Sequence, residues 1–173
     1  MSATHVIMIK PSRPDNEGQR LAALESLLIL DTPPEARFDQ IVEFAAREFD
    51  VPIALITLLD TDRQWFKANV GLGATCQTSR DISFCGHTIL RSEIMVVPDA
   101  HKDARFHDNP LVTGHPHIRF YAGAPLVLSS GYALGSLCII DTVPRDAATI
   151  DLAMLSTLRH LVMRELEPKA ATA

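Results

Sequence analysis

Two apolar segments decide the fold: IRFYAGAPLVL at residues 118–128 and ALGSLCII at residues 133–140. Both are rich in residues that favour strands, and Ser129-Ser130-Gly131 lies between them. Serine and glycine are typical of tight turns, so we predict a β-hairpin. The small residues 122–124 of the first segment leave room either for a cavity in front of the sheet or for a helix packed closely behind it.

Three further segments are predicted as strands. Residues 53–59 form a nearly unbroken apolar run, which is typical of a central strand buried on both faces. Residues 64–70 alternate between apolar and polar types, which predicts a half-buried strand with Phe66 and Ala68 on one face. Residues 95–98 predict a short edge strand, because Pro98 cannot donate a hydrogen bond to a neighbouring strand.

Helical spacing of apolar residues predicts three longer helices. The first covers residues 16–30, with the side chain of Asn16 as its cap and the prolines after Thr32 as its stop. The second has one apolar face. The third covers residues 147–167, and its apolar stripe is wider than one sheet contact requires, so part of it is available to a partner. The apolar face of the second helix consists of Phe38, Ile41, Val42, Ala45 and Phe49.

The remaining segments complete an α+β domain with an antiparallel sheet and helices packed on one face. We expect a short helix at residues 84–91, and loops at 74–83 and 99–117. A loop as long as the second is usually functional in a compact domain. Residues 16–167 are expected to form this single domain, preceded by a flexible arm over 1–15 and followed by a disordered tail over 168–173.

The composition restricts the classes of partner and the compartment. The chain has 173 residues, of which 47% are hydrophobic and 21% charged, and this balance is typical of one folded domain. Its formal net charge is −5 and no cluster of Lys and Arg stands out, so we expect neither nucleic acid nor a membrane as partner. No secretory signal is recognisable, and three widely spaced cysteines favour free thiols in the cytoplasm: Cys76, Cys85 and Cys138.

The order of these elements resembles the GAF domain family, as do the Ser83–His87 block, the segment from Asp99 to Val112 and the two hairpin strands. The similarity is greatest to members found upstream of bacterial histidine kinases and diguanylate cyclases. It implies a central antiparallel sheet, with terminal helices packed on one face and a cover of loops and a short helix on the other. It also implies a ligand cavity beneath that cover and a homodimer through helices 16–30 and 147–167.

The resemblance does not identify the ligand or a cofactor. The Asn-Lys-x-Phe-x-x-x-Asp-Glu motif of cyclic-nucleotide-binding members is missing, and Cys85 lies earlier than the bilin-binding cysteine of phytochrome-like members. No kinase or cyclase domain follows Glu167, so we expect a separate output protein of that kind to receive the signal. The candidate ligand-binding residues lie in the cover and the first hairpin strand: Phe84, Cys85, His87, Arg105, Asp108, Asn109, Arg119 and Tyr121.

Each of these candidates also has a structural interpretation. A nearby imidazole could activate the thiol of Cys85, but on a helix Cys85 and His87 would point apart, which favours packing. Arg105 or Arg119 could meet an anionic ligand, or could pair with acidic residues and hold the loop to the sheet, which we favour. The loop histidines could bind a metal, but solvated side chains are the preferred interpretation and no metal site is expected. These are His101, His107, His115 and His117.

Three functions remain open at this point. The first is a stand-alone sensory domain without catalytic residues, which binds a small molecule and signals through a dimer or partner protein. The second is a thiol-dependent reductase of small metabolites with Cys85 as nucleophile, which requires a second thiol within reach. The third is a ligand-free dimerisation or interaction module, which predicts a cavity filled by side chains such as Phe84, Leu111 and Tyr121.

Overall fold

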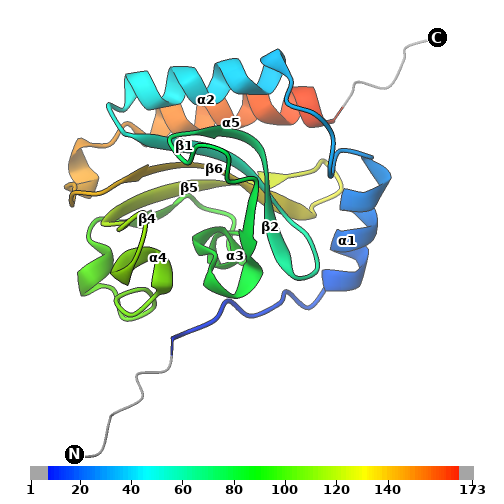
Figure 1. Ribbon diagram of the computed structural model, residues 1–173. Coiled ribbons are helices and arrows are strands. Elements are labelled where there is room, and N and C mark those ends of the chain that lie inside the picture. Colours follow the sequence, from blue (N-terminus) through cyan, green and yellow to red (C-terminus); the bar gives the residue numbers. More distant parts are fainter. Residues whose placement is uncertain (1–7, 168–173) are drawn as a thin grey trace, which may run out of the picture.

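A computed structural model describes residues 8–167 and shows an antiparallel sheet of six strands in the order β3-β2-β1-β6-β5-β4 (Figure 1). Two helices, α2 and α5, cover one face of this sheet, and short helices and loops cover the other. The predicted α+β class and two-sided arrangement are therefore confirmed. The strands are β1 (Ile53–Leu59), β2 (Arg63–Val70), β3 (Gln77–Ser79), β4 (Met95–Val97), β5 (Phe120–Val127) and β6 (Ala133–Asp141); the helices are α1 (Glu17–Ser26), α2 (Ala36–Glu48), α3 (Phe84–Thr88), α4 (Pro110–Thr113) and α5 (Leu152–Leu166).

The predicted hairpin is present as β5 and β6, which pair from Phe120 and Asp141 at one end to Val127 and Ala133 at the other. Gly131 in the connecting turn has a φ of +94°, a backbone conformation that glycine adopts at little cost. β1 lies between β2 and β6, and all seven of its residues are buried. The predictions of a central strand at 53–59 and of a short edge strand at β4 are confirmed.

β2 contradicts the prediction of a half-buried, evenly alternating strand. The register shifts at a bulge, so that Thr57 pairs with Phe66 while Ile56 pairs with Ala68, and Lys67 is the extra residue. An extra residue reverses the alternation of side chains. Phe66 therefore packs on the cover side of the sheet and Ala68 on the helix side, and the central part of the strand is buried on both faces.

Several short elements were absent from the prediction or had other limits. The predicted loop at 74–83 contains β3 and a 3₁₀ turn, and the loop at 99–117 contains a 3₁₀ turn and α4. Such short elements carry too few residues for a periodic pattern. The predicted helix at 84–91 ends at Thr88, and α5 begins at Leu152, after a separate 3₁₀ turn over Ala147–Thr149.

α1 is shorter than predicted, because Leu28 adopts a left-handed conformation with a φ of +52°. The helix ends at Ser26, well before the prolines. Asn16 is the N-cap residue, but its side chain makes no capping hydrogen bond, so that part of the prediction was wrong. α1 lies at one side of the sheet near β6, and it is α2 that runs beside α5 (Figure 1).

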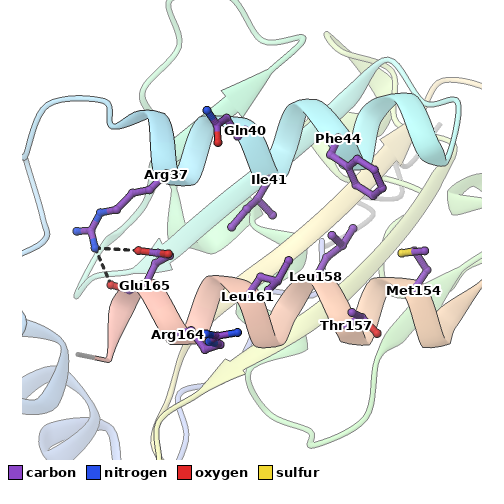
Figure 2. A pocket seen from close by; sticks show the side chains of 10 residues that line it. All are labelled: Arg37, Gln40, Ile41, Phe44, Met154, Thr157, Leu158, Leu161, Arg164 and Glu165. Carbon is purple, nitrogen blue, oxygen red and sulfur yellow. Dashed lines mark hydrogen bonds and ion pairs between the residues drawn. The ribbon is translucent and has the colours of Figure 1, made fainter. Parts of the chain in front are cut away.

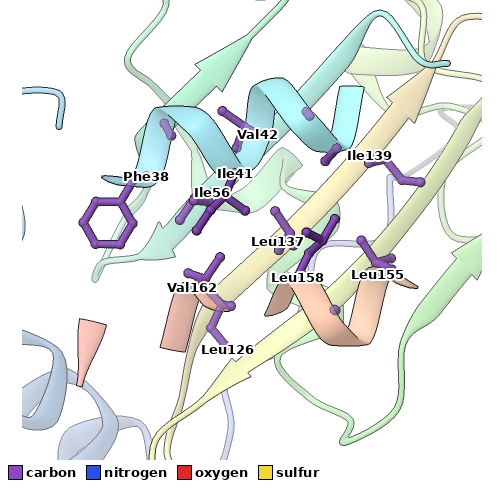
Figure 3. Close-up of a cluster of buried hydrophobic side chains, with 14 of the residues drawn as sticks. Phe38, Ile41, Val42, Ile56, Leu126, Leu137, Ile139, Leu155, Leu158 and Val162 are labelled. Carbon is purple, nitrogen blue, oxygen red and sulfur yellow. The ribbon is translucent and has the colours of Figure 1, made fainter. Parts of the chain in front are cut away.

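Two apolar cores lie on the two faces of the sheet. On the helix side, α2 and α5 pack on the central strands (Figure 3). All five apolar residues predicted for the second helix are buried. The smaller core on the cover side contains Phe84, Phe106 and Tyr121. The domain limits stay a prediction, since residues 1–7 and 168–173 of the predicted arm and tail lie outside the described residues. Within residues 8–167, no helix has the length and apolar character needed to span a membrane.

Candidate functional site

A cavity of about 30 Å³ lies on the cover side of the sheet, between α3, the loop after α4 and the central strands. One water molecule needs at least roughly 10–15 Å³ of such space, so the cavity holds one or two molecules of that size. Its walls are mostly apolar and include the three side chains that the interaction-module hypothesis requires. The lining residues are Leu55, Gln64, Phe66, Leu72, Thr78, Phe84, Cys85, Leu111, Pro116, Ile118, Tyr121, Cys138 and Ile140.

Tyr121 anchors a buried polar network beside the cavity. Alternation along β5 directs Phe120 into the helix-side core and Tyr121 into the cover-side core. The Tyr121 hydroxyl lies 2.8 Å from Thr88 Oγ1, 3.2 Å from Cys85 Sγ and 3.4 Å from Ser136 Oγ. Burial raises the pKa of this hydroxyl well above its usual value, so it acts as a neutral hydrogen-bonding group.

Cys85 faces this network from α3. Ser83 caps the helix by accepting a hydrogen bond from the Gly86 N–H, and this cap orients the first turn towards the sheet. The Cys85 sulfur accepts a hydrogen bond from Ser136 Oγ at 2.8 Å and lies 4.0 Å from Cys138 Sγ on β6. The second thiol that the reductase hypothesis requires is therefore within reach.

The two thiols differ in acidity. Burial raises the pKa of Cys85, but hydrogen bonds from its polar neighbours outweigh that effect and lower the pKa to about 7. For Cys138, burial and the neighbouring Cys85 both raise the pKa well above its usual value. Cys85 is thus the thiol that ionises first.

His87 does not serve as a partner of Cys85. Because residues 84–88 are helical, its ring turns away from the thiol and packs edge-on against Phe106, with ring centres 5.0 Å apart. Burial lowers the pKa of His87, which favours the neutral imidazole. The expectation that the two side chains point apart on a helix is confirmed. Phe84, by contrast, does line the cavity and stacks on Phe106 at 4.0 Å.

The two candidate arginines are bound by acidic residues of the cover loop. Arg119 donates to both carboxylate oxygens of Asp99, at 2.9 and 3.0 Å, and Arg105 does the same to Asp103, at 3.0 and 2.8 Å. Bidentate pairs of this kind fix the relative orientation of the guanidinium and the carboxylate. The alternative in which these charges pair with each other is confirmed, and neither guanidinium lines the cavity.

Asn109 and Asp108 lie where the cover loop meets α3. Asn109 is only 2% exposed; its side chain caps α4 by accepting from the Leu111 N–H and donates to the Ile82 carbonyl at 3.0 Å. It therefore ties α4 to the segment that precedes α3. Asp108 is half-buried, and its Oδ2 atom has no hydrogen-bond partner among the described residues.

Polar residues of the site that were not among the candidates include Gln64, Ser136 and Cys138. Ser136 and Cys138 lie two residues apart on β6, so strand alternation places both on the cover face. The spacing of two residues between Ser136 and Cys138 could therefore have predicted from the sequence that they share a face. Gln64 is 5% exposed and lines the cavity, and its Oε1 atom has no hydrogen-bond partner among the described residues.

The loop histidines do not gather around a metal site. Within residues 8–167 there is no group of three or more His, Cys, Asp or Glu side chains placed to hold a metal ion. All four histidines of the cover loop are exposed to solvent: His101, His107, His115 and His117.

A second concave surface, of about 550 Å³, lies between α2 and α5 on the far side of the sheet (Figure 2). Ile41 and Leu158 form its floor, and Phe44 and Leu161 flank it with exposed fractions of 39% and 40%. At one end, Arg37 donates to the carboxylate of Glu165 at 3.3 Å. Part of the wide apolar stripe predicted for the last helix, namely Met154, Leu158 and Leu161, lines this α2/α5 groove together with residues of α2.

Residues 33–166 match the family model of the GAF domain. The chain belongs to the GAF domain family. Across 166 residues, 95% of this GAF domain chain, it is 45% identical to "Cyclic di-GMP phosphodiesterase PA2567" of Pseudomonas aeruginosa. The chain spans 28% of the length of that relative.

Solved structures confirm the GAF fold. The GAF domain of an Acinetobacter phosphoenolpyruvate-protein phosphotransferase has a TM-score of 0.60 at 22% identity, covering 86% of this chain and 92% of that one. The free methionine-R-sulfoxide reductase of Neisseria meningitidis has a TM-score of 0.62 at 18% identity, covering 92% and 95%. At these identities the likeness concerns the fold alone.

Proposed function

We propose that this chain is a regulatory GAF domain that controls cyclic di-GMP hydrolysis by a phosphodiesterase, carried on the same polypeptide or on a partner. The observation that supports this is the 45% identity to a protein named as such a phosphodiesterase, over nearly the whole of this chain. The matched part is a minor fraction of that relative, which fits a regulatory role. The three free cysteines fit the reducing cytoplasm.

The signal in this proposal is a small molecule rather than cyclic di-GMP itself. Pockets for drug-sized ligands have volumes of about 300–1,000 Å³, and the cavity has about 30 Å³. A dinucleotide does not fit beneath the cover in this arrangement. Among the proposed ligand-binding residues, Phe84, Cys85 and Tyr121 would contact the signal directly, and Asn109 would hold the cover in place.

The output surface in this proposal is the α2/α5 groove, through which the domain forms a homodimer or contacts a partner. β5 connects the two sites, because Tyr121 borders the cavity while its neighbour Phe120 packs in the core beneath α2 and α5. A change at Tyr121 can therefore shift the helices through one rigid strand. The exposed Phe44 and Leu161 would become buried in the contact.

A second candidate, a ligand-free interaction module, is favoured by one observation. Phe84, Leu111 and Tyr121 all lie around the cavity and leave little free space. In that case the α2/α5 groove would be the functional surface, and the cover would serve only to complete the fold.

A chimera distinguishes these functions. In it, this chain replaces the matched 166 residues of the Pseudomonas aeruginosa phosphodiesterase, and cyclic di-GMP hydrolysis is measured with purified protein. Leu111→Trp adds bulk at the cavity, and Val143→Trp adds a similar bulk at an exposed site. We expect Leu111→Trp to change the hydrolysis rate about fivefold or more, and Val143→Trp to leave it unchanged. Equal rates in both variants and in a deletion of the domain would contradict a regulatory role.

A further inference from the structure

We propose that Cys85 and Cys138 form a redox-active thiol pair, which hydrogen peroxide admitted to the adjacent cavity converts into a disulfide. The pair joins two layers of the molecule, since Cys85 lies on α3 in the cover and Cys138 on β6 in the sheet. Their sulfur atoms are 4.0 Å apart, and both side chains are at most 2% exposed. A disulfide has a sulfur–sulfur distance of about 2.05 Å, so the atoms must approach by about 2 Å.

The short helix α3 can supply this movement. β6 is held by hydrogen-bonded strands on both sides, whereas α3 has five residues and ends at Thr88. A small shift of α3 towards the sheet brings Cys85 to Cys138 without breaking strand pairing. The same shift would displace Phe84 and the rest of the cover.

The cavity matches the size and polarity of the oxidant. Its volume of about 30 Å³ accommodates a molecule little larger than water, and both thiols lie in its wall. Gln64 supplies an unpartnered buried oxygen there, to which an O–H group of hydrogen peroxide can donate. Substrates the size of an amino-acid sulfoxide do not fit in this arrangement, which distinguishes the inference from the reductase hypothesis.

Access to the cavity requires little opening. Leu72, Thr78, Leu111 and Pro116 line it and are also partly exposed to solvent. These partly exposed side chains form the outer wall of the cavity. Side-chain rotation in that wall takes place on fast timescales and would admit a small neutral molecule.

The chemistry balances with hydrogen peroxide as the only co-reactant. Cys85 ionises by losing a proton to solvent, and the hydrogen bond from Ser136 stabilises the thiolate. The thiolate sulfur attacks one peroxide oxygen, the O–O bond breaks, and the departing hydroxide takes a proton to become water. Cys85 is then a sulfenic acid. The sulfur of Cys138 attacks it, the S–S bond forms, the S–O bond breaks, and the hydroxyl leaves with the Cys138 proton as a second water.

The experiment uses this chain with Cys76→Ser, because Cys76 is an exposed thiol that would obscure the result. The reduced protein is treated with hydrogen peroxide, alkylated after denaturation and mapped by mass spectrometry. We expect a disulfide between Cys85 and Cys138 that dithiothreitol reverses. Cys138→Ser or Cys138→Ala should stop at a sulfenic acid on Cys85, which dimedone traps, and Cys85→Ser should leave Cys138 reduced.

Two results would overturn the inference. If Cys85 and Cys138 remain fully alkylatable while the same peroxide treatment oxidises Cys76 in the unmodified chain, the pair serves packing only. If Gln64→Leu leaves the oxidation rate unchanged, peroxide does not use the cavity. Neither result concerns the phosphodiesterase, so the chimera tests the proposed function separately.

Discussion

The phenol ring of Tyr121 lies over Gly123, in the space that a side chain at position 123 would occupy. A Cβ atom added to Gly123 would lie 2.6 Å from Tyr121 Cζ, closer than unbonded carbon atoms approach each other. Gly123 therefore sets the position of the Tyr121 hydroxyl against Thr88 and Cys85. Of the small residues 122–124, only Gly123 faces the cover side, where Tyr121 fills the room that it leaves. Ala122 and Ala124 belong to the core beneath the helices, so each of the two alternatives holds for part of the segment.

Gly123→Ala is expected to destabilise the protein by about 1–3 kcal/mol, because the added methyl group overpacks the cover-side core. Urea unfolding measures the change. Gly18→Ala is the matched control, since it adds the same group to helix α1 in open space and should stabilise by about 0.5–1 kcal/mol. Equal effects at the two positions would contradict the crowding of Tyr121.

Glu17 joins two buried arginines, and we expect Glu17→Gln to destabilise the protein by about 2–4 kcal/mol at pH 7. The Glu17 carboxylate lies 2.9 Å from Arg20 Nε and 2.5 Å from Arg80 Nη1, and both arginines are at most 3% exposed. The substitution leaves their charges uncompensated. Chemical unfolding measures the loss. Asp81→Asn, which breaks an exposed pair with Lys10, should cost less than about 0.5 kcal/mol.

The effect of Glu17→Gln should depend on pH. Burial raises the pKa of Glu17, but hydrogen bonds from the two arginines outweigh it and lower the pKa from 4.5 to about 2. Since the folded pKa is depressed, the contribution is fully present above about pH 4.5 and is lost as the pH falls towards 2. The difference in unfolding free energy between Glu17→Gln and wild type should shrink over that interval. A constant difference down to pH 3 would argue against the pairing.

Ser136→Ala is expected to raise the pKa of Cys85 from about 7, because the thiolate loses the hydrogen bond that Ser136 Oγ donates. Thiolate absorbance as a function of pH, in a Cys76→Ser background, measures the titration. Ser92→Ala removes a hydroxyl from an exposed site and should leave the thiolate titration curve unchanged. An identical curve in both variants would show that Ser136 does not stabilise the thiolate.

Leu161→Asp should dissociate a homodimer formed through the α2/α5 groove, because it places a charge in the contact. Sedimentation of wild type and variant at equal concentration measures this. Leu28→Asp tests residues 16–30, which the sequence predicted to share the dimer contact with the last helix. Leu28 is 83% exposed, and its φ of +52° is a conformation that aspartate tolerates. If Leu28→Asp dissociates the dimer and Leu161→Asp does not, the contact lies at α1.

The local pattern of apolar and polar residues was sufficient to predict the larger elements and part of the site. Periodicity predicted the hairpin, the central strand and the buried face of α2, because burial of one face imposes a regular spacing on the residues. It failed at β2, where the bulge beside Thr57 reverses the alternation, and at β3 and α4, which are too short to show a period. Tyr121 was among the candidate residues and lines the cavity, but the strand pattern by itself did not decide whether Tyr121 or Phe120 faces it.

By itself, the sequence determined the α+β class and the position of Cys85 on a short helix, since these follow from patterns of neighbouring residues, and the order of the elements along the chain indicated the GAF family. Only the tertiary structure decided what Cys85 faces. Its neighbours Ser136 and Cys138 are more than fifty positions away in the chain. Which thiol meets which hydroxyl depends on the register of β5 and β6 and on the docking of α3, and both follow from packing of the whole core rather than from local preference.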